Sequence, residues 1–147
     1  MALPKKHLAV RKSTLPGAGK GLFAKKFIQK GTRIVEYKGR ISTWKEVSDT
    51  DSRYIFYVKR DHVIDAGPRK SAIARFANDA RGLSRVNGVR NNAVYDEDGL
   101  RVYITATRDI PAGSEILVDY GKEYWQVVRQ NLRAERREAR RADAIAK

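Results

Sequence analysis

Short runs of apolar residues alternate with turn-forming residues along most of the chain, a pattern typical of domains built mainly from short β-strands. Two β-rich runs separated by Arg60-Asp61 predict a hairpin. A second pair is joined through Asp96–Gly99, a composition that favours a turn. The strands predicted in this way are Leu8–Lys12, Thr32–Tyr37, Tyr54–Lys59, His62–Ala66, Asn92–Tyr95, Leu100–Ala106 and Glu115–Val118.

Helical signals are few. Thr43-Trp44-Lys45-Glu46 fits a capping box, so a short helix is predicted to start there. Lys70–Ala77 has room for one or two helical turns. After Gly121 the chain contains no further Gly or Pro and becomes rich in Ala, Arg and Glu, which predicts a helix from Lys122 onward. We therefore expect a mostly β fold followed by a basic C-terminal helix.

Length and composition narrow the class of protein. The 147 residues correspond to one ordinary domain, and 41% hydrophobic with 33% charged residues is typical of soluble globular proteins. There is no apolar run long enough to span a membrane, and the first residues lack the apolar stretch of a signal peptide. With no Cys and two His, a zinc enzyme is not expected, nor any metal site. An intracellular location is expected, cytoplasmic or nucleoid-associated, with delivery to a host cell left open.

The net charge of +14 is concentrated at the two ends. Residues 1–30 hold eight Lys or Arg and no acid, and residues 126–147 hold seven against three acids. Such ends suit contact with nucleic acid or an acidic partner, but they also occur as solvated ends that maintain solubility. The pattern leaves both interpretations open.

Four short motifs carry residues of possible chemical importance, beginning with Gly19-Lys20-Gly21. A phosphate-binding loop would need Gly and Ser or Thr where Thr14 and Gly21 stand, so that match fails. Taken alone, this segment favours a plain turn, or a turn that lets a ligand approach the bare backbone. The other three motifs are Tyr37-Lys38-Gly39, Arg75-Phe76-Ala77-Asn78-Asp79 and Glu115-Ile116-Leu117-Val118-Asp119-Tyr120.

In this order and spacing, the four motifs resemble those of the SET-domain family of protein lysine methyltransferases, here in a compact form of microbial or viral type without Cys-rich flanks. The likeness runs from about Leu8 to Trp125. It departs from the family pattern at Asp79, where the family has His, and at Val118, where it usually has Phe or Tyr. The resemblance implies a SET domain over residues 1–125, with a basic helix or tail over residues 126–147.

The family fold is a set of small curled sheets in which a threaded, knot-like loop brings the Asn78 and Tyr120 segments together. By resemblance, Tyr120 is the catalytic residue and S-adenosylmethionine is the cofactor. The residues implied in cofactor binding are Ala18, Gly19, Lys20, Gly21, Asn78, Asp79 and Trp125. The residues implied in a lysine channel are Tyr37, Tyr54, Phe56 and Val118.

The reaction implied is methyl transfer to a neutral lysine amine of a protein, such as a histone or another basic protein. Desolvation and a nearby sulfonium both lower the pKa of that amine, so the enzyme needs alignment more than acid–base groups. The small Val118 predicts di- or trimethylation. Two alternatives stay open: a non-enzymatic nucleic-acid-binding module, and a SET-like scaffold without activity. A homodimer is also possible.

Overall fold

Strands dominate the computed structural model, which describes residues 2–47, 55–67, 72–82, 85–121 and 133–142. The helical elements with defined bounds are short: η1 (Lys5–His7), α1 (Trp44–Val47) and η2 (Ile73–Phe76). The strands are β1 (Leu8–Lys12), β2 (Lys20–Ala24), β3 (Arg33–Glu36), β4 (Arg40–Ser42), β5 (Ile55–Lys59), β6 (His62–Asp65), β7 (Ala93–Asp98), β8 (Arg101–Ala106), β9 (Glu115–Ile116) and β10 (Val118–Asp119). The predicted mostly β class is therefore confirmed.

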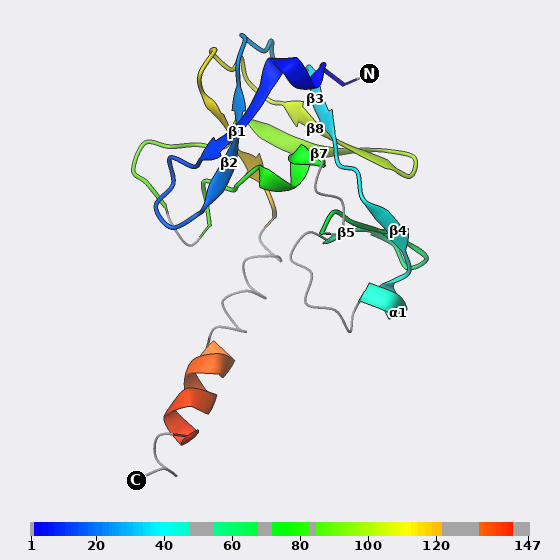
Figure 1. Cartoon of the computed structure of the whole chain (residues 1–147), viewed down its shortest axis with the longest axis vertical. Helices are drawn as coiled ribbons and strands as arrows, with labels where there is room; N and C mark the ends of the chain where they lie inside the picture. Colours follow the sequence, from blue (N-terminus) through cyan, green and yellow to red (C-terminus); the bar gives the residue numbers. More distant parts are fainter. Residues whose placement is uncertain (1, 48–54, 68–71, 83–84, 122–132, 143–147) are drawn as a thin grey trace.

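These strands form three small sheets, shown in Figure 1. The first sheet has the order β1-β2-β9, the second β10-β7-β8-β3, and the third β4-β6-β5. Most neighbouring strands are antiparallel, but β10 runs parallel to β7. The first and second sheets are linked by the short connection between β9 and β10.

The single strand predicted over Glu115–Val118 is wrong in one respect, because it is divided between two sheets. Residues 115 and 116 pair with β2, and residues 118 and 119 pair with β7. The side chain of Asn92 holds the break: its Nδ2 donates to the Glu115 carbonyl at 2.9 Å, and its Oδ1 accepts from the Leu117 amide at 2.8 Å. Such a switch depends on a distant residue, so local β propensity does not reveal it.

Both predicted hairpins form, the second with a tighter turn than expected. The β7–β8 register continues from Ala93↔Ala106 to Asp98↔Arg101, so three acidic residues expected in the turn belong to the strand. Arg33 offsets their charge, since its guanidinium lies 3.1 Å from Asp98 and 3.8 Å from Asp96. Gly99, with φ of +62°, makes the sharp turn that remains.

The predicted short helices are also present. At the start of α1, the Glu46 amide donates to Thr43 Oγ1 at 3.3 Å, and the Thr43 hydroxyl donates to the Glu46 carboxylate at the same distance. The first contact is the side-chain cap of a capping box, whereas the Glu46 carboxylate bonds to the Thr43 hydroxyl and not to the Thr43 amide. η2 lies within the segment predicted to hold one or two helical turns. The predicted start of the C-terminal helix lies outside the described residues, but residues 133–142 are helical.

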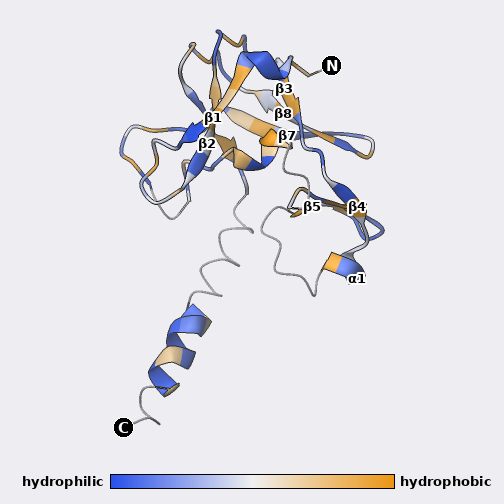
Figure 2. Ribbon diagram, viewed as in Figure 1, coloured by the Kyte–Doolittle hydropathy of each residue, from blue (hydrophilic) through white to orange (hydrophobic). Residues whose placement is uncertain are grey.

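The main hydrophobic core is formed by residues from all three sheets and from η2. Its largest fully buried side chains include Leu22, Ile34, Ile104 and Ile116. Figure 2 shows apolar residues gathered on the strands of this body, whereas the helix at residues 133–142 is mainly hydrophilic. Every residue of that helix is exposed. Among the described residues, no helix is long and apolar enough to cross a membrane.

Gly39 fixes how the third sheet joins the rest of the fold. A Cβ added there would lie 2.3 Å from the Asp65 carbonyl oxygen and 2.7 Å from the Ala66 nitrogen. Both are backbone atoms that cannot rotate away, so only Gly permits this approach. The Gly of the Tyr37-Lys38-Gly39 motif is therefore required by packing between the β3–β4 connection and the end of β6.

Candidate active site

Tyr120 follows β10 and is held against the segment that contains Asn78. Its hydroxyl donates a hydrogen bond to the Ala77 carbonyl, and its amide donates to the Asp79 carboxylate at 2.9 Å. Two residues earlier, in β10, the Val118 amide donates to the Asn78 carbonyl at 2.8 Å. Two motifs about forty residues apart in sequence are thus brought side by side, as the resemblance implied.

Asp79, which stands where the family has His, has a defined role in this contact. Its side chain is buried, and its two oxygens accept hydrogen bonds from the Arg81 amide, from Asn91 Nδ2 and from the Tyr120 amide, each at 2.8–2.9 Å. A buried carboxylate needs such donors to offset its lost hydration. The carboxylate therefore orders the loop and Tyr120.

Asn78 connects this segment to the Gly-rich turn. Its Nδ2 donates to the Lys20 carbonyl at 3.0 Å and lies 3.3 Å from a Glu115 carboxylate oxygen. On the turn itself, Gly19 is exposed with φ of +71°, and a Cβ added there would meet no atom within 4 Å. The predicted cofactor residues at positions 18–21 and at Asn78 therefore lie together beside open space.

Glu115 is the buried centre of these contacts. The sequence did not indicate how many hydrogen bonds its carboxylate accepts. The residue is only 6% exposed. It accepts hydrogen bonds from the Ser13 hydroxyl at 2.7 Å, and from the Thr14 hydroxyl and amide at 2.6 and 2.9 Å. A Cβ on Gly21 would lie 2.3 Å from the same carboxylate, which explains the second Gly of the motif. Glu115 thus ties three distant segments into one site.

Four aromatic rings form a cluster that ends at Tyr120. The ring centroids of Tyr37 and Phe56 are 6.0 Å apart, and both rings contact Tyr95, at 6.0 and 5.0 Å. Tyr95 in turn stacks on Tyr120 with a centroid distance of 6.2 Å and an interplanar angle of 23°. We call Tyr37, Phe56, Tyr95 and Tyr120 the aromatic cluster.

Tyr95 is the residue of this cluster that the sequence interpretation missed. Its position two residues after the buried Ala93 places both on the same face of β7, so strand alternation was the available signal. Val118 is fully buried in the hydrophobic core against which Phe56, Tyr95 and Tyr120 pack. Two other predicted site residues, Tyr54 and Trp125, lie outside the described residues.

Comparison with known proteins agrees with this geometry. The family profile described as SET domain matches residues 19–121, which is most of the chain. The chain belongs to the SET-domain family. This SET domain is 24% identical to the methyltransferase domain of human PR domain-containing protein 2, with a TM-score of 0.59 over 81% of this chain and 79% of that one. That likeness supports the SET fold.

Three similar curated proteins come from three different organisms. The SET domain is 31% identical over 132 residues to the variant-silencing SET domain-containing protein of Plasmodium falciparum (isolate 3D7). It is 26% identical over 134 residues to N-lysine methyltransferase KMT5A of Xenopus tropicalis, and 31% identical over 114 residues to histone-lysine N-methyltransferase 2D of Homo sapiens. These matches cover 81%, 79% and 69% of this chain, but only 5%, 37% and 2% of the respective relatives.

Proposed function

We propose that this SET domain is a protein lysine N-methyltransferase that uses S-adenosylmethionine. The proposal rests on the hydrogen bonds that join three of the motif segments. Tyr120 is bonded through its hydroxyl and its amide to residues 77–79, and Asn78 is bonded to the Gly-rich turn. The segment that we assign to cofactor binding and the candidate catalytic hydroxyl are thus joined by direct hydrogen bonds.

The residues around the Gly-rich turn fit the proposed cofactor. Gly19 offers bare backbone beside open space, and the Asn78 carboxamide lies across the turn from it. When bound, S-adenosylmethionine supplies an electrophilic methyl group on a sulfonium. Ala18, Gly19, Lys20, Gly21, Asn78 and Asp79 are the described residues that we assign to its binding, Asp79 through its backbone.

The aromatic cluster provides the environment that a lysine amine needs in order to react. A lysine has an ordinary pKa of about 10.4, so the neutral nucleophile is scarce at pH 7. Apolar ring walls disfavour the ammonium form and lower its pKa. The Tyr120 hydroxyl and the Ala77 carbonyl, already in contact, can orient the amine after it has lost its proton to solvent. Alignment of this kind contributes several kcal/mol to catalysis, with no need for a general base.

The substrate is proposed to be a lysine-bearing protein, as the names of the relatives suggest for histone and N-lysine methyltransferases.

We further propose that the basic ends bring the enzyme to nucleic acid or to an acidic partner surface. Residues 133–142 contain five Arg and two Glu and are all exposed. At the other end, Lys6, Lys25 and Lys26 are exposed near one another, since the Lys25 amide bonds to the His7 carbonyl. Both surfaces suit polyanions.

Transfer of a labelled methyl group from S-adenosylmethionine to protein lysines, located by mass spectrometry, tests the proposal. Tyr120→Phe should lower turnover by a hundredfold or more, on the scale of one lost catalytic hydrogen bond. Tyr57→Phe is the matched control, because Tyr57 is 51% exposed and contacts Trp44, away from the aromatic cluster. Equal rates for the two variants would remove Tyr120 from catalysis. Nucleic-acid binding without any cofactor binding would favour the non-enzymatic alternative.

A further inference from the structure

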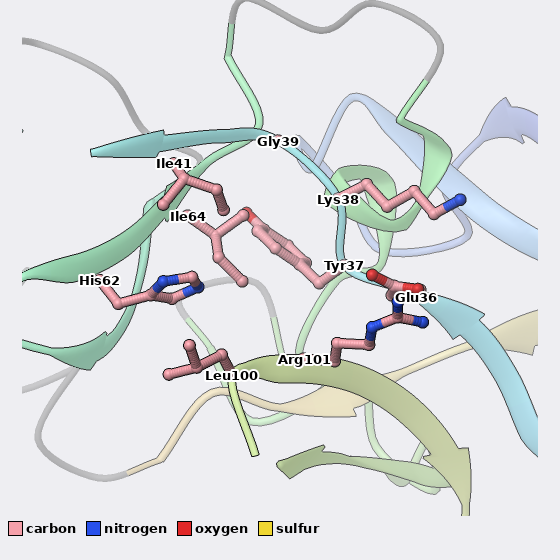
Figure 3. Close-up of a pocket in the computed structure, with 9 residues that line it drawn as sticks. All are labelled: Glu36, Tyr37, Lys38, Gly39, Ile41, His62, Ile64, Leu100 and Arg101. Carbon is pink, nitrogen blue, oxygen red and sulfur yellow. The ribbon is translucent and has the colours of Figure 1, made fainter. Parts of the chain in front are cut away.

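A pocket of about 450 Å³ lies beside the aromatic cluster, between the third sheet and the tip of the β7–β8 hairpin (Figure 3). Tyr37 belongs to both sites, since it lines the pocket while its ring packs against Phe56 and Tyr95. A polypeptide that places a lysine in the aromatic cluster therefore has neighbouring side chains within reach of this pocket. Its other walls include Glu36, Ile41, His62, Ile64, Leu100 and Arg101.

The pocket has mixed polar and apolar walls, and one of its residues carries an unsatisfied polar atom. Ile41 and Leu100 line it and are 55% and 47% exposed, so an apolar ligand stem would cover them. The Nε2 atom of His62 is buried and has no hydrogen-bond partner within the described part of the chain. Leaving such an atom unpaired costs about 1–3 kcal/mol, and a ligand oxygen could recover this cost after the imidazole turns to expose the atom to the pocket. The pocket thus suits a side chain with an apolar stem and a polar tip.

The charges around the pocket favour an anionic tip. Arg101 and Lys38 are cationic and Glu36 is anionic, so the lining carries a net positive charge. Arg101 is charged at any working pH, as arginine is in proteins generally. The hydrogen bond to Tyr103, followed by the charges of Tyr103, Glu36 and Asp98, raises its pKa further.

We infer that this pocket binds a glutamate side chain of the substrate, close in sequence to the methylated lysine. This inference rests on the proposed function, and it names a substrate class for the same site. In an extended peptide, alternate side chains point the same way and lie about 6.5–7 Å apart. The glutamate is therefore expected within a few residues of the lysine and on the same face of the peptide. Its carboxylate would be bound by Arg101 and, once the imidazole has turned, by the N–H of His62.

Peptides with a single lysine test the inference, with Glu, Gln or Lys placed in turn at each flanking position. Peptide binding is measured by calorimetry and methylation by mass spectrometry. One position should favour Glu over Lys by about tenfold in Kd and in KM, on the scale of a partly desolvated charge contact. Arg101→Glu should reverse that preference. Arg108→Glu, the same charge change at an exposed residue outside the pocket, should leave it unchanged.

His62→Phe separates the hydrogen bond from the packing of the ring. It should weaken binding of both the Glu and Gln peptides about fivefold and leave the binding of a Leu peptide unchanged. Equal affinity for Glu, Gln and Lys at every position, or a preference that Arg101→Glu does not alter, would overturn the inference. Peptides that bind with the Glu preference but accept no methyl group would instead refute the proposed activity and leave the pocket assignment standing.

Discussion

Glu115→Gln is the substitution that most directly tests how the site is assembled. One carboxylate oxygen accepts from the Thr14 amide and hydroxyl, and the other from the Ser13 hydroxyl and Asn78 Nδ2. Hydroxyl groups can rotate to become acceptors, but an N–H cannot. Whichever way the Gln amide is turned, its NH₂ therefore faces the N–H of either Thr14 or Asn78. The remaining bonds also lose the contribution of a charged acceptor.

The loss can be estimated from these contacts. One buried N–H left without an acceptor, together with weaker bonds at the other positions, should cost about 2–3 kcal/mol of unfolding free energy. For a domain of this size, that lowers Tm by roughly 4–12 °C. Urea unfolding and calorimetric titration with S-adenosylmethionine should show a less stable protein and weaker binding. The exposed Glu97→Gln is the control. If both variants match the parent in stability, Glu115 does not hold the site together.

Three further changes test separate parts of the site. Asn78→Ala removes the contact with the Lys20 carbonyl and should weaken S-adenosylmethionine binding about tenfold in a folded protein, as measured by calorimetry. Because Val118 is fully buried, Val118→Tyr should cost about 1–3 kcal/mol of stability. In the protein that still folds, it should shift the long-time product from di- or trimethyl-lysine toward monomethyl-lysine by mass spectrometry. Deleting residues 133–147 should leave activity on a short peptide unchanged and lower activity on a DNA-bound protein, and the loss should shrink at high salt. If the truncated and full-length proteins have equal rates on both substrates at low salt, the tail is only a solvated appendage.

The sequence was sufficient to predict those elements whose structure is set by residues close together along the chain. The hairpin through Arg60-Asp61 and the helix start capped by Thr43 depend on contacts within a few residues, and both form as predicted. The division of the predicted strand at Leu117 depends on the Asn92 side chain, 25 positions away, and was not visible. The same holds for Tyr95, whose neighbours in the aromatic cluster come from three other segments. The motif order indicated the family, but only the fold shows how Asp79 serves Tyr120.

The division of residues 115–119 between two sheets also has a consequence for how the protein folds. β9 completes the first sheet by pairing with Leu22 and Phe23, more than ninety residues earlier, and β10 completes the second at Ala93. Pairings over such separations form slowly, because the entropy of closing a long loop opposes them until native contacts compensate. During synthesis, one edge of β2 and one edge of β7 therefore remain unpaired until the chain has reached residue 119. Chaperone dependence and aggregation of shortened chains are expected of this protein in the cell, more than of a domain whose strands pair in sequence.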